Sequence, residues 1–312
     1  MAKYRNALPQ LGERIFVTDG GIETTLIFLD GLDLPLFAAF PLHDTPEGWA
    51  ALKKYFTPYA ALARDRGAGC VLETATWRAN HDWGVKLGYS AEALERVNRD
   101  AVKLLLELRK EFETEASPLV ISGCLGPRGD GYQPEAKMTA EEAQAYHDLQ
   151  VRVFAETDAD LVTAITMNYV EEAIGIARAA RARNMPVVIS FTVETDGRLP
   201  TGQSLQEAIE ETDAATDGAP LYYMINCAHP EHFRDLLRDR PEWARRLQGI
   251  RANASTKSHA ELNESTELDA GDPEALARDY VELKELLPAL RVVGGCCGTD
   301  HRHITAIHSA VG

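Results

Sequence analysis

The sequence lacks long hydrophobic runs and is short of positive charge, and each lack excludes a class of protein. No run of about 18 apolar residues occurs, which excludes an ordinary membrane-spanning helix. Of the 312 residues, 48 are acidic and only 32 are basic, and the net charge of −16 argues against a nucleic-acid partner. The opening residues MAKYRNALPQ lack the apolar core of a signal peptide, so we expect a cytoplasmic protein.

Cysteine is also scarce, and linker-like segments are missing. Five cysteines, at positions 70, 124, 227, 296 and 297, are an odd number in a long chain, which argues against a disulfide framework and favours thiol or metal chemistry. Hydrophobic residues make up 45% of the chain, which excludes disorder. Because no proline- or serine-rich linker and no break in composition divides the sequence, we predict a single domain over residues 1–312.

Short apolar runs alternate with helix-length segments along the whole chain. Most runs, such as PVVISF and ADLVTAI, are continuous, which is typical of strands buried on both faces of a parallel sheet. The predicted strands are 14–18, 69–73, 119–122, 160–165, 187–191, 221–225, 249–251 and 291–293. The predicted helices include 46–66, 170–184, 204–215, 230–240 and 300–309, and others that begin after Ser90, Thr139 and Asp272.

Eight strand–helix units in strict alternation predict a closed (β/α)8 barrel. A doubly wound open sheet is the alternative, but it normally carries a glycine-rich GxGxxG fingerprint after its first strand. The corresponding segment here, TDGGIE, has two glycines without that spacing. We therefore favour the barrel, an α/β fold whose functional residues gather where strands end.

Three of the five cysteines fall at predicted strand ends. Cys227 follows the sixth strand, and Cys296 and Cys297 follow the eighth. Alternate strands contribute to the same interior layer, so Cys227 and Cys296 are expected at similar depth in the barrel mouth. Neighbouring residues of a regular strand face opposite ways, but the glycines around Cys296 and Cys297 give the backbone freedom to turn both thiols to one centre.

Three converging thiolates are a ligand set for a catalytic zinc ion, with the fourth tetrahedral position left for substrate. An all-sulfur set favours a further thiol as the fourth ligand, held as a thiolate and therefore nucleophilic. The expected reaction is attack of that thiolate on a methyl carbon. The competing interpretations are cysteines that are merely buried, as we expect for Cys70 and Cys124, and a redox pair of Cys296 and Cys297. The nearby His229, His301 and His303 are expected at helix starts or on the surface.

The segments GGCCGTDHRHI, INCAHPEHF and TDGGIETTL together resemble the homocysteine S-methyltransferase family, and in particular its single-barrel members that use betaine or S-methylmethionine. Further matches are ETATWRAN, SGCLGPRG, SFTVETDGRLPTGQS and RANAS. The resemblance covers nearly the whole chain. It implies a barrel, zinc on Cys227, Cys296 and Cys297, and a thiol acceptor that completes the coordination.

The resemblance also implies residues around the acceptor. Asp19 and the backbone of Gly20 and Gly21 are expected to hold its amino-acid end, while Asn226 and Asn253 are expected to order the site.

One position departs from the family pattern. Members commonly carry a glutamate at the end of the fourth strand that binds the ammonium group of homocysteine, and Ile165 stands there, followed by the expected Thr166. Glu73, next to Thr74 at the second strand end, is a candidate substitute, unless it pairs with a cation such as Arg78. Arg78 could itself bind a carboxylate, or form a surface ion pair.

The sequence thus predicts a zinc-dependent S-methyltransferase that acts on homocysteine to give methionine, or on a thiol without an α-ammonium group. A single barrel leaves no room for a cobalamin module, and no Asp-x-His-x-x-Gly motif occurs, so we expect a small donor such as S-methylmethionine or S-adenosylmethionine. Betaine, or a separate corrinoid protein as partner, remains open. A non-catalytic zinc or redox sensor is a second hypothesis. A phosphate site at residues 298–300 is a third, which Asp300 disfavours.

Overall fold

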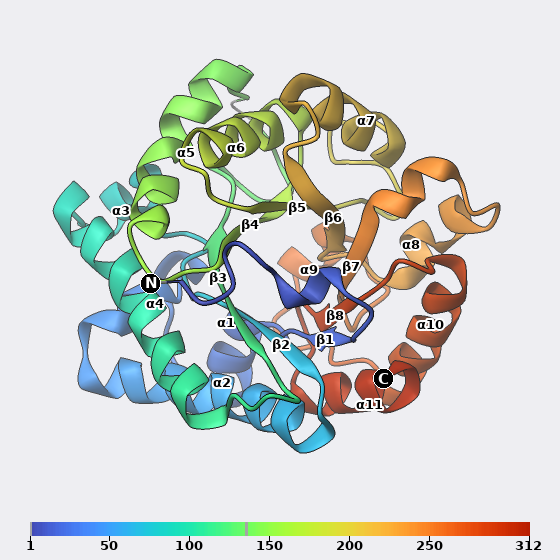
Figure 1. The fold of residues 1–312 in the computed structure, drawn as a ribbon, viewed down its shortest axis with the longest axis horizontal. Helices are drawn as coiled ribbons and strands as arrows, with labels where there is room; N and C mark the ends of the chain where they lie inside the picture. Colours follow the sequence, from blue (N-terminus) through green and yellow to red (C-terminus); the bar gives the residue numbers. More distant parts are fainter. Residues whose placement is uncertain (1, 135–136) are drawn as a thin grey trace.

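A closed barrel of parallel strands forms the centre of the computed structural model, which describes residues 2–134 and 137–312 (Figure 1). Within these residues eight strands pair in sequence order, and the eighth pairs with the first. The barrel prediction is therefore confirmed, and the open-sheet alternative is wrong. No helix of the described residues is long and apolar enough to cross a membrane.

The strands are β1 (Phe16–Val17), β2 (Gly69–Glu73), β3 (Leu119–Leu125), β4 (Leu161–Met167), β5 (Val187–Phe191), β6 (Pro220–Asn226), β7 (Leu247–Ala252) and β8 (Val292–Gly295). The helices are α1 (Ile22–Thr24), α2 (Pro46–Arg66), α3 (His81–Lys86), α4 (Ala91–Phe112), α5 (Ala140–Ala155), α6 (Val170–Ala182), α7 (Leu205–Thr216), α8 (Pro230–Phe233), α9 (His259–Asn263), α10 (Pro273–Leu286) and α11 (His301–Val311).

Most predicted bounds agree with these elements to within three residues, and the helix predicted over 230–240 is the main exception. Helix α8 ends at Phe233 and a short 3-10 turn, Arg234–Leu237, follows it. Arg240 then adopts a left-handed backbone with a φ of 48°. It precedes Pro241, whose ring disfavours helical geometry in the preceding residue.

The interior of the barrel changes from apolar to polar along the strands. An apolar cluster fills the half near the strand starts, with Phe16, Val71, Val120, Leu161 and Val188 among its members. The N-terminal segment lies across that end, where Leu8 joins the cluster (dark blue in Figure 1). The strand starts are thus covered, and the cavity described below lies at the opposite end.

In strands β2 to β6, the inward position two residues beyond the apolar cluster is polar. Because side chains alternate between the faces of a strand, Glu73, Ser122, Thr163, Ser190 and Asn226 follow the inward apolar residues of β2 to β6. All five are buried. The barrel therefore places a polar interior layer directly beneath its open end.

A buried aspartate ties the covered end of the barrel together. Asp160 is fully buried and accepts hydrogen bonds from the backbone amides of Tyr4 (2.7 Å) and Ile121 (2.9 Å). The Arg109 guanidinium, also buried, donates to the same carboxylate. One side chain thus joins the N-terminal segment, strand β3 and helix α4.

Replacing this carboxylate is expected to cost much more stability than replacing an exposed one. Asp160→Asn leaves the buried Arg109 charge without its counter-ion, which costs about 3 kcal/mol or more of unfolding free energy. Asp235→Asn, at an exposed ion pair with Arg238, is the matched control and should change stability by less than about 0.5 kcal/mol. Urea denaturation measures both, and equal effects would contradict this account.

Candidate metal centre

Three cysteine sulfurs meet at the open end of the barrel. The Sγ atoms of Cys227, Cys296 and Cys297 all lie within 4.8 Å of one another. Three thiolates bound tetrahedrally to one zinc ion, at about 2.3 Å each, lie roughly 3.8 Å apart. The three sulfurs are thus close enough to share one ion, and the cluster predicted from the sequence is confirmed.

An unusual backbone conformation directs the Cys227 thiol to this centre. Asn226 faces the barrel interior, so on a regular strand the next side chain would face outward. Cys227 instead adopts a φ of 54°, in the left-handed region that non-glycine residues rarely occupy. Its carbonyl accepts hydrogen bonds from Asn253 Nδ2 (3.0 Å) and His259 Nε2 (2.5 Å), and its amide donates to the Arg251 carbonyl (3.2 Å). These contacts hold the strained conformation.

The second pair of cysteines lies just beyond β8 in a tightly packed loop. The Cys296 amide donates to the Ala252 carbonyl (2.8 Å), and the Cys297 carbonyl accepts from the Ala254 amide (3.1 Å). Gly294 and Gly295, before the pair, serve close packing rather than unusual dihedral angles, whereas Gly298, after the pair, has a left-handed backbone with a φ of 80°. The expected backbone freedom is therefore used after the pair and not before it. A Cβ atom at Gly295 would lie 2.0 Å from the Thr299 hydroxyl oxygen.

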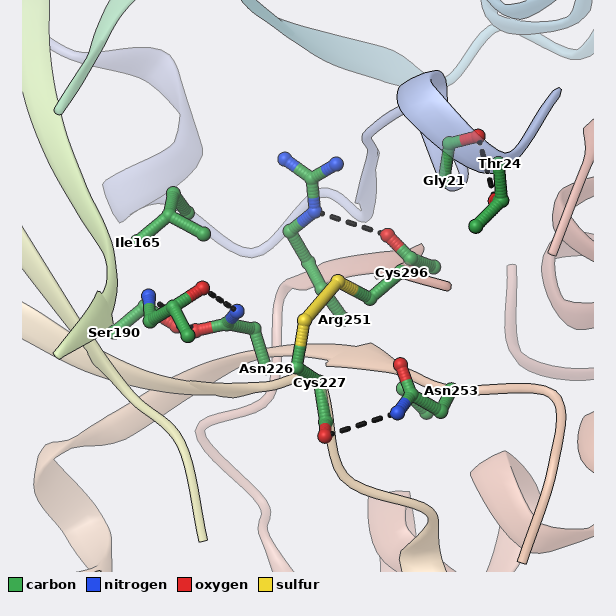
Figure 2. The surroundings of a disulfide bond; sticks show 12 residues. Gly21, Thr24, Ile165, Ser190, Asn226, Cys227, Arg251, Asn253 and Cys296 are labelled. Atoms are coloured by element: carbon green, nitrogen blue, oxygen red, sulfur yellow. Dashed lines mark hydrogen bonds between the residues drawn. A yellow bond between two sulfur atoms is a disulfide. The ribbon is translucent and has the colours of Figure 1, made fainter. Parts of the chain in front are cut away.

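Two of the three cysteines are joined by a disulfide bond, shown in Figure 2. The bond links Cys227 to Cys296, whose Cα atoms are 5.4 Å apart, and leaves Cys297 as a free thiol. We expected free thiols at this site, and Cys296–Cys297 as the redox pair, so both expectations are corrected. A disulfide sulfur cannot act as a thiolate ligand, and the state that binds a metal ion is therefore the reduced one.

Asn226 braces the strand ends next to the cluster. Its amide oxygen accepts hydrogen bonds from the Thr166 amide (2.9 Å) and the Ser190 hydroxyl (2.6 Å), and its amide nitrogen donates to the Thr166 hydroxyl (2.8 Å). Thr166 also has a left-handed backbone, with a φ of 65°. Asn226 thus joins the ends of β4, β5 and β6 and fixes the start of the Cys227 turn.

An inner cavity opens above the cysteines. Most of the residues predicted to bind the acceptor line it: Asp19, Gly20, Gly21, Glu73, Thr74 and Thr166. Ile165 lines it too, and contributes no charge. Asn253 and Arg78 instead line an adjoining outer chamber, which shares Cys297 with the inner one. The roles of these residues toward a substrate stay predictions.

Asp19 makes a buried ion pair that the sequence did not reveal. Arg251 Nη2 lies 2.7 Å from Asp19 Oδ1, and the Tyr55 hydroxyl donates to Oδ2 at 3.0 Å. Burial raises the pKa of Asp19, while the Arg251 charge opposes that shift. Figure 2 shows the guanidinium group of Arg251 above the disulfide. The sequence feature that could have revealed Arg251 is its position at the end of the predicted strand 249–251, two residues before Asn253.

Arg78 does not pair with Glu73. Its guanidinium lies over the rings of Trp83 (3.9 Å) and Trp77 (4.9 Å) and donates to the Leu36 carbonyl. Among the described residues Arg78 makes neither that pair nor the surface ion pair considered as an alternative. Its packing on tryptophans explains why, since stacking and burial hold the side chain at the outer chamber.

The remaining candidates behave as the sequence predicted. Cys70 and Cys124 are buried free thiols. His229 and His303 lie at the starts of α8 and α11, where His229 Nδ1 accepts a hydrogen bond from the Glu231 amide.

Comparisons with known proteins agree with this geometry. The family model for homocysteine S-methyltransferase matches residues 16–311. The chain belongs to the homocysteine S-methyltransferase family. It is 27% identical over 318 aligned residues to homocysteine S-methyltransferase 3 of Zea mays, covering 94% of this chain and 88% of that one. It is 24% identical to selenocysteine Se-methyltransferase of Brassica oleracea var. italica, covering 94% and 87%.

Solved structures show the same fold. The metallated form of the homocysteine methyltransferase MmuM from Escherichia coli matches with a TM-score of 0.75 at 20% identity, covering 97% of this chain and 98% of that one. The oxidized form of the same protein matches equally well.

Removing the brace at Asn226 should weaken metal binding. Asn226→Ala deletes three hydrogen bonds at the Cys227 turn, and loss of such supporting contacts typically lowers metal affinity about 10- to 100-fold. Chelator competition on reduced protein measures the affinity. Asn98→Ala is the matched control, because Asn98 is equally buried and hydrogen-bonded but lies between α4 and the 74–80 loop, away from the cavity. An affinity unchanged in Asn226→Ala would contradict the role assigned to this residue.

Proposed function

We propose that this family member is a zinc-dependent S-methyltransferase that methylates homocysteine from a small cationic donor and so forms methionine. The observation that carries the proposal is the convergence of three cysteine sulfurs at the open end of the barrel. Cys227, Cys296 and Cys297 would hold the ion in the reduced protein, and their soft thiolates suit zinc. When bound, zinc lowers the pKa of an acceptor thiol so that it is present as a thiolate.

The reaction then requires mainly that the acceptor and the donor are held next to each other. The acceptor lies in the inner cavity with its sulfur beside the cysteines and loses its thiol proton to solvent on binding. Its sulfur electron pair forms the new bond to the methyl carbon, while the donor's bond to that carbon breaks and leaves its electron pair on the departing atom. The buried walls of the cavity exclude water from this nucleophile.

The outer chamber suits a positively charged donor. Aromatic side chains of Phe28, Phe37, Trp77 and Tyr132 line it. Three carboxylates, those of Asp130, Glu267 and Asp269, outnumber its one guanidinium, that of Arg78. Aromatic faces and carboxylates both attract sulfonium or quaternary ammonium groups. This lining supports S-methylmethionine, S-adenosylmethionine or betaine over a corrinoid protein, which would need a wide docking surface.

A second candidate function is a redox sensor, which the Cys227–Cys296 disulfide favours. The two candidates differ in turnover. A panel of homocysteine and selenocysteine with the three donors, assayed on reduced, zinc-loaded protein, should yield a methylated acceptor. If no combination yields a methylated acceptor, and Cys227 and Cys296 are oxidised reversibly, the sensor is favoured.

Each cysteine of the cluster should be essential for metal binding. Wild-type protein reduced and loaded with zinc is expected to retain one ion per chain after gel filtration, whereas Cys227→Ala and Cys297→Ala retain almost none. Elemental analysis measures the ion. Cys70→Ala is the control, because Cys70 is buried in the packing layer outside the barrel interior and should leave metal content and turnover unchanged. Full zinc content in Cys227→Ala would refute the site.

A further inference from the structure

Glu73 is a buried carboxylate, and one of its two oxygens lacks a partner. It lies at the end of β2, its residue is 4% exposed, and it lines the inner cavity. Its Oε2 atom is buried and has no hydrogen-bond partner among the described residues. A buried carboxylate oxygen without a partner is costly, and in a native structure it calls for a partner such as a water molecule, an ion or a ligand.

The other charges at the cavity do not fill this role. Arg251 directs its hydrogen bonds to Asp19, the Gly20 carbonyl and the Gly295 carbonyl, and none to Glu73. Arg251 therefore acts on Glu73 only through space and supplies no hydrogen-bond donor to its free oxygen. Burial accordingly raises the pKa of Glu73 to about 7, although Arg251 and the hydroxyls of Ser122 and Thr163 lower it.

The inner cavity as a whole is acidic. Its lining includes three carboxylates, those of Asp19, Glu23 and Glu73, against the single guanidinium of Arg251. A ligand that places a cation next to Glu73 would restore the balance and supply the missing hydrogen-bond donor. Ile165, which lines the same cavity from β4, offers no competing carboxylate.

We propose that Glu73 is the residue that selects an acceptor with an ammonium group, by binding that group directly in the inner cavity. The proposal rests on the proposed function, because it takes the acceptor to be a thiol held at the cysteine cluster. It assigns the acceptor to the class of amino-acid thiols, rather than thiols with a carboxylate alone.

Two ligands and one isosteric substitution test this assignment. Homocysteine and 4-mercaptobutanoate differ only in the ammonium group, so the ratio of their dissociation constants isolates its contribution. Calorimetric titration of reduced, zinc-loaded wild-type protein should show homocysteine binding about 10- to 100-fold more tightly. Glu73→Gln should bring that ratio close to one by weakening homocysteine alone, and Glu73→Asp should give an intermediate ratio.

Glu172→Gln is the matched control. Glu172 is also buried and pairs with His147 (2.8 Å), but it does not line the cavity, so its loss should leave the ratio unchanged. A wild-type ratio below about twofold overturns the proposal without need of any variant. A Glu73→Gln protein that keeps the wild-type ratio, whether its affinities are unchanged or both fall by the same factor, overturns it as well. If neither thiol binds the zinc-loaded wild type, the proposed function itself fails.

Discussion

The site depends on a backbone constraint at the end of β6, where Cys227 is held in a left-handed conformation. Strand geometry alone would direct Asn226 inward and Cys227 outward, and the ligand set would then lack its member from β6. A left-handed backbone at a non-glycine residue costs about 1–3 kcal/mol and persists only where its surroundings enforce it. Here Asn253 and His259 donate hydrogen bonds to the Cys227 carbonyl, and the Cys227 amide donates to the backbone of β7. This strain is confined to Cys227, and it brings the sulfur at the end of β6 to the two sulfurs that follow β8.

The remainder of the barrel supports that arrangement by dividing its interior. Apolar side chains fill the covered end, where they supply stability without polar cost. The next inward layer is polar, and its Asn226 brace and Asp19–Arg251 pair are satisfied within the protein. Glu73 differs from these neighbours because one of its oxygens is left without a partner. The layer thus combines polar groups that are hydrogen-bonded within the protein with a carboxylate that has one free oxygen.

Much of the fold could be predicted because the responsible signals are local. Continuous apolar runs located β2 and β5 at both ends, and the proline and capping residues located the starts of α2 and α10. The cysteine cluster was also predictable, since strand ends of a barrel meet at one rim. The helix over 230–240 failed because a pattern of apolar residues does not report the break ahead of Pro241.

The partners within the site were not predictable from local signals. Arg251 and Asp19 are 232 residues apart, and only the closure of β8 against β1 brings them together. His259 lies in the short helix α9, which was not predicted although Ser258 and Glu261 form a capping box at its start. It contacts the Cys227 carbonyl and stacks on Tyr132 with ring centroids 4.0 Å apart. The disulfide likewise joins Cys296 to Cys227, 69 residues away, and not to its neighbour Cys297.

X-ray absorption at the zinc edge tests the central claim most directly, because it counts the sulfur atoms around the ion. Reduced, zinc-loaded protein is expected to show three sulfur ligands at about 2.3 Å with one lighter ligand, and addition of homocysteine should replace the lighter ligand with a fourth sulfur. A first coordination sphere made mainly of nitrogen and oxygen, or one that homocysteine leaves unchanged, would contradict the account.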